Sequence, residues 1–271
     1  MLKLTIARSY LFVPGNRPER FLKAHHSGAD RVILDLEDAV AEADKDDARR
    51  QVSEYLGAGG TGIVRINATE DRWLDDVLAC VKPGLQGLVL PKAESSEHVS
   101  RIVSQLPSTV KVLPLIETAH GMNRINEIAA TPGVERLVFG TVDFRTELGI
   151  EGDDESLLYF RSMIVLASKV AGIAAPIDGV TVAINDKGEL ERAATRARHL
   201  GFAAKLCIHP SQVEDVNKAF RPSDAQLAWA EKVVRLAKSS PGAFKVDGEM
   251  VDAPVIARAV ELLKQGGCSS I

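Results

Sequence analysis

The stretch VILDLEDAV (residues 32–40) indicates how the whole chain is organised. It begins as the apolar, β-branched run of a buried strand, and it then places Asp35, Glu37 and Asp38 within four residues. Carboxylates so close to an apolar strand are costly unless a cation or a hydrogen-bond donor faces them. The stretch therefore predicts a parallel α/β sheet with a polar site at the carboxyl ends of its strands.

The same pattern of a short apolar strand followed by a helix recurs along the chain. Strands are expected at residues 9–13, 31–36, 62–66, 87–91, 111–116, 136–140, 176–180 and 204–208. Helices are expected at 18–28, 41–57, 69–81, 95–106, 121–130, 155–172, 187–201 and 211–220. Eight such units are typical of the (β/α)8 TIM barrel, and we predict this α/β fold for residues 1–221.

Residues 222–271 follow the predicted barrel and carry two further helical patterns. Between these patterns lies PGAFKVDGEMVD (residues 241–252), whose glycines suit a lid or a hairpin. We expect this region to form a C-terminal helical extension with a lid segment.

Composition and charge exclude several classes of protein. The chain has 271 residues and a net charge of −4, without the basic stripe of a nucleic-acid-binding protein. Its three cysteines, Cys80, Cys207 and Cys268, are far apart, which favours reduced thiols over a disulfide framework or a zinc site. The N-terminus lacks the apolar core and cleavage site of a signal peptide, and no 18-residue apolar run occurs. We expect a cytoplasmic protein that binds neither nucleic acid nor a membrane.

Polar side chains gather at the predicted carboxyl ends of the strands, whereas the amino ends carry comparatively few of them. In (β/α)8 barrels the active site lies at the carboxyl ends. This asymmetry predicts an enzyme. The residues concerned are Asn16, Arg17, Asp35, Glu37, Asp38, Arg65, Asn67, Lys92, Glu117, Asp143, Asp178 and His209.

Two of these acids suggest a metal site. Glu117 and Asp143 follow neighbouring strands, and no histidine or cysteine that would suit a softer metal accompanies them. An all-oxygen pair suits Mg²⁺ or Mn²⁺, with water and a chelating substrate completing the six positions. Each acid could equally cap a helix, so the pair by itself leaves both interpretations open.

The arginine at the end of the third strand needs a partner. Arg65 shares its strand face with Ile63 and Asn67, so it is expected to point into the barrel, where an unpaired charge is costly. A structural ion pair with Glu37 or Asp38 and a catalytic role are compatible. We expect Asp35 to be mainly structural.

Other polar residues have two interpretations each. Lys92 is expected to act through its charge rather than as a Schiff-base lysine, because the acid pair indicates metal chemistry. His209, which precedes Pro210, is expected to be structural or to contact a ligand rather than to act as a general base.

With these residues in view, the chain resembles the citrate lyase β-subunit-like branch of the HpcH/HpaI aldolase family, which includes malyl-CoA and citramalyl-CoA lyases. The resemblance covers nearly the whole chain in order, which makes it far more specific than any single motif. It is carried by RSYLFVPGNRPERFLKA (8–24), VILDLEDAVAEADKDDAR (32–49), VRIN (64–67), LPKAES (90–95), LIETAHG (115–121), GTVDF (140–144), CIHPSQ (207–212) and GEMVDAPVIARA (248–259).

The resemblance implies a role for particular residues. Mg²⁺ would be bound by Glu117 and Asp143, Arg65 would stabilise a thioester enolate, and Asp252 would be the acid/base on the lid. Glu37 and Asp38 would support this site. Arg17 and Lys23 would contact the CoA phosphates. Further candidates for contacts to the substrate or to CoA, from their own positions in the sequence, are Asn67, Lys92, His209 and Pro210.

The resemblance also implies an assembly and a reaction. Family members are usually trimers or hexamers, with a C-terminal segment that reaches a neighbouring subunit's active site. The implied reaction is a reversible Claisen-type cleavage of a carboxylated 3-hydroxyacyl-CoA, such as malyl-CoA, methylmalyl-CoA or citramalyl-CoA. Its products are a 2-oxo acid and an acyl-CoA. This sequence has Val142 where many relatives have glutamate, a change that would alter metal affinity or substrate choice.

Two alternatives remain open at this point. The first is that the chain is a β subunit of citrate lyase, which acts on a citryl thioester of an acyl carrier protein. A catalytically silent barrel that binds acyl-CoA as a scaffold is the second alternative, which the retained site residues disfavour.

Overall fold

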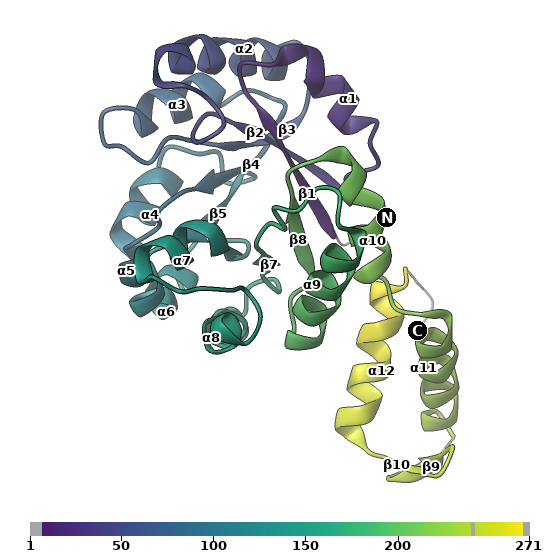
Figure 1. Cartoon of the computed structure of the whole chain (residues 1–271). Coiled ribbons are helices and arrows are strands. Elements are labelled where there is room, and N and C mark those ends of the chain that lie inside the picture. Colours follow the sequence, from purple (N-terminus) through teal and green to yellow (C-terminus); the bar gives the residue numbers. More distant parts are fainter. Residues whose placement is uncertain (1–6, 240–241, 268–271) are drawn as a thin grey trace. The chain divides into compact units, whose positions relative to one another are not determined.

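The computed structural model describes residues 7–239 and 242–267. Within them, eight parallel strands form a closed barrel in sequence order (Figure 1). This confirms the predicted (β/α)8 barrel, and each strand lies where the sequence predicted it. The strands are β1 (Ser9–Pro14), β2 (Arg31–Asp35), β3 (Gly62–Arg65), β4 (Leu85–Leu90), β5 (Lys111–Ile116), β6 (Val138–Phe139), β7 (Ile177–Asp178) and β8 (Ala204–Cys207).

Helices surround the barrel, and several start where a side chain caps the first turn. Ser95 accepts a hydrogen bond from the backbone of His98, and Asp186 accepts one from Glu189. The helices are α1 (Phe21–His25), α2 (Lys45–Gly57), α3 (Trp73–Cys80), α4 (Ser96–Val103), α5 (Ala119–Asn123), α6 (Ile125–Ala129), α7 (Thr141–Leu148), α8 (Leu158–Val170), α9 (Lys187–Leu200) and α10 (Val213–Ala219).

Two helical details differ from the sequence prediction. The single helix expected at 121–130 is divided into α5 and α6 at Arg124, whose backbone leaves the helical region. Helix α7 was not predicted, because its N-cap is Gly140, which offers no side-chain cap. Asp143 therefore lies in the first turn of a helix rather than in an irregular loop.

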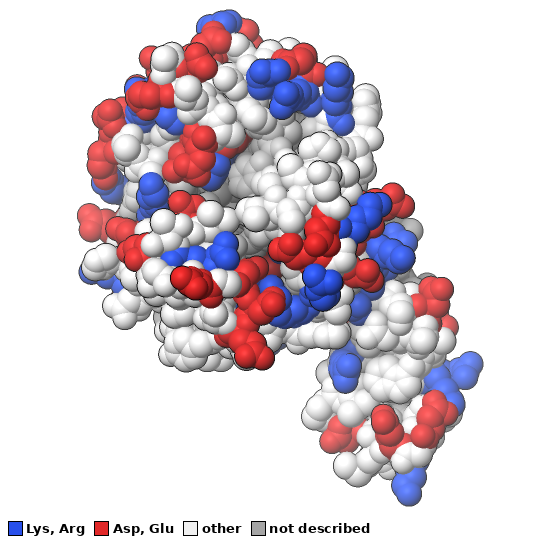
Figure 2. Space-filling model, in the orientation of Figure 1, with Lys and Arg blue, Asp and Glu red and all other residues white. Residues whose placement is uncertain are grey.

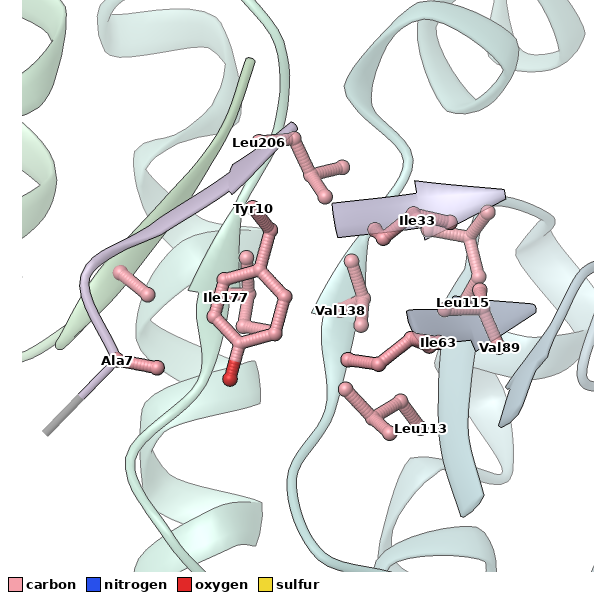
Figure 3. Close-up of a cluster of buried hydrophobic side chains, with 11 residues drawn as sticks. Ala7, Tyr10, Ile33, Ile63, Val89, Leu113, Leu115, Val138, Ile177 and Leu206 are labelled. Carbon is pink, nitrogen blue, oxygen red and sulfur yellow. The ribbon is translucent and has the colours of Figure 1, made fainter. Parts of the chain in front are cut away.

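The barrel interior is apolar and explains where the polar site begins. Alternate residues of each strand point inward, so that Ile63 and Leu115 belong to the core while Arg65 and Glu117, two positions later, extend the same faces toward the carboxyl ends. Figure 3 shows the inward-pointing side chains of this core. They are Ala7, Tyr10, Ile33, Ile63, Val89, Leu113, Leu115, Val138, Ile177, Ala204 and Leu206.

Asp178 has a structural role that its position at a strand end did not reveal. Its two carboxylate oxygens accept hydrogen bonds from Arg161 at 2.8 Å and from Lys205 at 3.0 Å, and all three side chains are fully buried. Burial alone would raise the pKa of this carboxyl, but the two cations lower it overall. The group thus ties α8 to β7 and β8.

The described residues divide into two compact units: a barrel unit, Ala7–Asn217, and a tail unit that contains residues 218–239 and 242–267. In the tail unit, α11 (Asp224–Ala237) and α12 (Ala253–Gln265) pack together around an apolar core, and β9 (Phe244–Val246) pairs with β10 (Glu249–Val251) in an antiparallel hairpin. The helical extension and the hairpin are as expected, whereas the lid role and the boundary at 221/222 stay predictions. No helix in the described residues is long and apolar enough to cross a membrane.

Candidate functional site

A cavity of about 370 Å³ opens at the carboxyl ends of the barrel strands. Figure 2 shows the barrel unit hollowed on the face it presents, with acidic and basic side chains around the hollow. Five residues that the sequence singled out line the cavity together: Asp35, Asp38, Arg65, Glu117 and Asp143. Residues from four different strand ends therefore meet in one space.

Arg65 forms ion pairs with the three carboxylates at the end of β2 and directly after it. Its Nε and Nη2 donate to the two carboxylate oxygens of Asp35 at 2.7 and 2.6 Å. Its Nη1 donates to Asp38 at 2.9 Å and lies 3.0 Å from Glu37 Oε2. Its guanidinium carbon lies 4.7 Å from the ring centre of Phe12. The expected pairing with Glu37 and Asp38 is present, but the main partner is Asp35, and this bidentate contact fixes the plane of the guanidinium.

Asp35 is fully buried and also organises the turn after β2. Its oxygens accept hydrogen bonds from the backbone N–H groups of Glu37 and Ala39 at 2.9 and 3.1 Å. Together with the two hydrogen bonds from Arg65, each oxygen of this carboxylate accepts two hydrogen bonds. The structural role expected for Asp35 is what these contacts show.

Glu37 is a buried carboxyl with an incomplete set of partners. Burial raises its pKa to about 7, because the nearby charges of Asp38 and Asp35 offset part of the effect of Arg65. Its Oε2 lies close enough to Arg65 for an ion pair, yet it makes no hydrogen bond to any described residue. Glu37 is therefore a poorly compensated acid beside Arg65.

Glu117 is held between two backbone segments. Its Oε1 accepts a hydrogen bond from the backbone N–H of Lys92 at 2.8 Å, and Lys92 has a left-handed backbone with φ 46°. On the other side, a Cβ at Gly140 would lie 2.5 Å from Glu117 Cβ and 2.6 Å from Oε2. Glycine is thus required at position 140 for Glu117 to occupy this place.

The electrostatics around Glu117 favour a cation. The side chain is buried, and burial followed by the charge of Glu37 raises its pKa to about 8. Asp143, in the first turn of α7, lines the same cavity. Within the part of the chain that the structure describes, no group of three or more His, Cys, Asp or Glu side chains could hold a metal. The donor set is this pair of acids, which suits a hard divalent ion that keeps positions for water and substrate.

The fold agrees with comparisons to known proteins. The family model for HpcH/HpaI aldolase/citrate lyase matches residues 8–210. The chain belongs to this family. Among solved structures, CitE from Mycobacterium tuberculosis, in complex with magnesium, acetoacetate and coenzyme A, has a TM-score of 0.84 and 37% identity. The match covers 97% of this chain and 100% of that chain.

Relatives in the HpcH/HpaI family carry different activities in their names. A citrate lyase subunit beta-like protein of Mycobacterium tuberculosis is 38% identical over 267 residues, which is 95% of each chain. A (3S)-malyl-CoA thioesterase of Cereibacter sphaeroides is 33% identical over 90% of this chain and 89% of its own length. Mitochondrial citramalyl-CoA lyase of Rattus norvegicus is 30% identical over 94% of this chain and 85% of its own length. The predicted family is confirmed, and its members include both lyases and thioesterases.

The contacts of Asn67 and His209 are structural. Asn67 is buried, and its backbone and side-chain N–H groups both donate to Asp76 Oδ2, at 2.8 and 2.7 Å. His209 is the N-cap of the 3₁₀ helix Pro210–Gln212, and its Nδ1 lies 2.8 Å from Ser211 Oγ. Their proposed roles in ligand binding stay predictions.

Three other predicted binding residues, Arg17, Lys23 and Lys92, are not among the residues that line the cavity. Arg17 is half exposed and donates to Glu19 at 2.8 Å, while Lys23 is exposed on α1. Lys92 contributes its backbone to Glu117, and its side chain is exposed. Asp252 belongs to the tail unit, where it caps α12 by accepting a hydrogen bond from Val255 N. The ligand contacts predicted for Arg17, Lys23 and Lys92 stay predictions, as does the acid/base role predicted for Asp252.

Sequence reasoning missed two contributors to the site. Gly140 ends a predicted strand, and a glycine at this position, close before Asp143, is a sign of close backbone approach. The apolar residues of the cavity, such as Phe12 and Val180, were assigned to strands without a role. Their spacing alone does not distinguish a core residue from a cavity wall.

Proposed function

We propose that this chain is a magnesium-dependent carbon–carbon lyase that cleaves a carboxylated 3-hydroxyacyl-CoA into a 2-oxo acid and an acyl-CoA. The observation that carries the proposal is that Arg65, fixed in position by Asp35, lines the same cavity as the acid pair Glu117 and Asp143. Part of the proposal is that the protein acts as a cytoplasmic homo-oligomer, a trimer or a hexamer.

The acid pair would hold Mg²⁺, with Mn²⁺ as a substitute. The metal, when bound, acts as a Lewis acid toward the hydroxyl oxygen that becomes the ketone. Glu117 has a fixed orientation for this task, since Lys92 N–H and Gly140 leave it little freedom. The magnesium complex of the similar CitE structure supports this assignment.

Arg65 would stabilise the charge that develops on the thioester oxygen. A guanidinium has five N–H groups, and the hydrogen bonds to Asp35 and Asp38 use three of them. The remaining N–H groups can donate to an oxygen in the cavity. Because Asp35 already holds the guanidinium, little reorganisation is needed as the charge appears.

The proton balance of the cleavage requires an acid. The bond between the hydroxyl-bearing carbon and the thioester α-carbon breaks, and its electron pair forms the enolate. The hydroxyl gives its proton to solvent, and the α-carbon takes up one proton. We propose Asp252 as the acid that supplies it, and Glu37 and Asp38 as groups that hold Arg65 in place.

The experiment that tests this proposal separates lyase from thioesterase chemistry. The purified protein is incubated with Mg²⁺ and malyl-, methylmalyl-, citramalyl- or citryl-CoA, and the products are resolved by mass spectrometry. The proposal predicts a 2-oxo acid and a shortened acyl-CoA. Free CoA with an intact hydroxy acid would show a thioesterase instead. Turnover of none of these esters would favour a carrier-bound citryl thioester or a binding scaffold.

A further inference from the structure

Helix α7, which carries Asp143, starts against the strand end that carries Glu117. Its N-cap, Gly140, donates a backbone hydrogen bond to Ile116 O at 2.9 Å. This bond extends the pairing of β5 with β6 and joins the start of α7 to the residue directly before Glu117. One hydrogen bond at one end of a helix does not fix the direction in which the helix runs. The position of Asp143 therefore depends on what holds the rest of α7.

The other end of α7 is held by Glu147. Its Oε2 accepts a hydrogen bond from the backbone N–H of Ala119 at 3.0 Å. Ala119 is the first residue of α5, directly after Thr118, and it follows the strand end that carries Glu117. Helices α5 and α7 lie side by side (Figure 1). The two ends of α7 are thus bonded to the chain on the two sides of Glu117.

The bond between Glu147 and Ala119 is a helix cap that comes from a distant part of the chain. The first N–H groups of a helix have no partner within the helix. In α5 the local cap is Thr118, whose Oγ1 accepts a hydrogen bond from Gly121 N at 3.0 Å. The N–H of Ala119 is bonded instead to Glu147, 28 residues away in the sequence. A hydrogen bond to a charged acceptor is stronger than one between neutral groups, which suits a contact that joins two helices.

Other contacts fix the Glu117 segment from the side of β4. A Cβ at Gly121 would lie 2.4 Å from Ala93 O, so α5 packs closely on the turn after β4. In the same turn, the backbone N–H of Lys92 donates to Glu117 Oε1 at 2.8 Å. Because Glu117 is held on this side, a bond from α7 to the same segment sets where Asp143 lies relative to Glu117.

Glu147 itself lies away from the reacting groups. It follows Asp143 by one turn of α7, and it is not one of the described residues that line the cavity. The residue is exposed, so water can replace the hydrogen bond that it makes, and the loss of this bond should destabilise the fold little. The bond between α7 and α5 therefore matters for the position of α7 more than for the stability of the barrel.

Resting on the proposed function, we infer that Glu147 is a positioning residue, which holds α7 against the Glu117 segment and so fixes the spacing of the acid pair that Mg²⁺ requires. Mg²⁺ demands nearly ideal octahedral geometry, whereas Ca²⁺ is larger and accepts flexible sites. An acid pair with a variable spacing should therefore lose affinity for Mg²⁺ more than for Ca²⁺. Glu147 would thus support metal selectivity without touching the metal.

Two substitutions at position 147 separate the effect of position from the effect of charge. Glu147→Gln removes the negative charge but keeps an oxygen that can accept from Ala119 N–H, whereas Glu147→Ala removes both. Calorimetry should show Mg²⁺ affinity about tenfold lower in Glu147→Ala, as for other groups that orient a metal ligand, and within about twofold of wild type in Glu147→Gln. Equal losses in the two variants would mean that Glu147 acts through its charge, and this result would overturn the inference. Wild-type affinity in both variants would overturn it as well.

A neighbouring acid provides the matched control. Glu151 is exposed and follows Glu147 by four residues, beyond the end of α7. Glu151→Ala removes the same charge as Glu147→Ala, and it should leave Mg²⁺ affinity unchanged. Ca²⁺ affinity, measured in the same proteins, should fall by a smaller factor than Mg²⁺ affinity in Glu147→Ala. A loss in Glu151→Ala as large as in Glu147→Ala would contradict the inference.

Turnover of the thioesters separates this inference from the lyase function. If wild-type protein binds Mg²⁺ but cleaves no thioester, the lyase proposal fails, and the Mg²⁺ affinities of the variants still decide the role of Glu147. If wild-type protein cleaves a thioester and Glu147→Ala binds Mg²⁺ as tightly as wild type, the lyase proposal stands and the inference is wrong. Wild-type protein that binds no divalent ion would overturn both. The inference predicts tight Mg²⁺ binding by the wild type and by Glu147→Gln, and weakened Mg²⁺ binding by Glu147→Ala alone.

Discussion

Both carboxylate oxygens of Asp35 accept hydrogen bonds from Arg65, one from Nε at 2.7 Å and one from Nη2 at 2.6 Å. The acid is fully buried, and it belongs to the strand next to the one that carries the arginine. The planar fork of arginine matches a carboxylate in this geometry, and lysine cannot reproduce it. The direction in which the free N–H groups of Arg65 point is thus set by a residue that is itself part of the barrel wall.

Replacing the buried partner should therefore be far more damaging than replacing the exposed one. Asp35→Asn leaves Arg65 with a weakened buried partner and should lower the free energy of unfolding by about 3 kcal/mol. The side chain of Asp38 is 60% exposed, so Asp38→Asn should change stability by less than about 1 kcal/mol. Urea denaturation of the two variants measures both values. Equal losses in the free energy of unfolding would show that the bidentate contact stabilises the fold no more than the exposed ion pair does.

Gly140→Ala should disturb Glu117 without touching any charge. The new methyl group would lie 2.6 Å from Glu117 Oε2, so the acid must move. We expect Mg²⁺ affinity to fall by about tenfold or more, since displacing a fixed ligand is comparable to losing the groups that orient it. Gly57→Ala is the control, because a methyl group there meets no atom within 4 Å. Unchanged Mg²⁺ affinity in Gly140→Ala would argue that Glu117 is not a ligand.

Metal binding should depend on pH in a defined direction. In the metal-free protein the pKa of Glu117 is raised from 4.5 to about 8, chiefly by burial. Because Mg²⁺ binds the ionised acid, its apparent affinity should increase as the pH rises from about 6 and level off above about 8. Calorimetry in buffers of different ionisation enthalpy should also show proton release. Affinity that is constant from pH 6 to 9 would contradict this prediction.

The same shift has a consequence for stability without metal. The folded protein holds the proton of Glu117 more tightly than the unfolded chain does. The protonated carboxyl therefore contributes to the stability of the folded state at low pH. This contribution is lost as the pH rises from about 4.5 to about 8. Added Mg²⁺ should reverse this loss. Thermal unfolding measured with and without Mg²⁺ across this range gives the sign directly.

The order of elements was predictable from the sequence, because eight apolar runs spaced by helical patterns leave few other folds. Strand parity and position alone predicted that Arg65 and Glu117 would both lie at the carboxyl ends of the barrel strands, where they line the same cavity. Helix α7 was not, because Gly140 gives its start no capping side chain. Asp178 also looked like a site residue, because it lies at the carboxyl end of a strand. Its ion pairs with Arg161 and Lys205 join segments far apart in the sequence, so the sequence pattern did not reveal them.

The tail offers a variant that separates chemistry from folding. Asp252 caps α12, and asparagine caps a helix about as well as aspartate. Asp252→Asn should therefore leave the tail unit folded while lowering turnover by about 100-fold or more through loss of the acid. Ser223→Asn, at the N-cap of α11, is the matched control and should keep full activity. Normal turnover by Asp252→Asn would remove this residue from the mechanism.

The most direct test of the account is the activity of the double variant Glu117→Gln/Asp143→Asn toward citramalyl-CoA. Both changes keep the shape of the side chains, and circular dichroism can confirm that the barrel is folded. We expect wild-type turnover to require Mg²⁺ and to stop in EDTA, and we expect the double variant to be slower by about 1000-fold or more at saturating Mg²⁺. Full activity of the double variant in excess EDTA would contradict it.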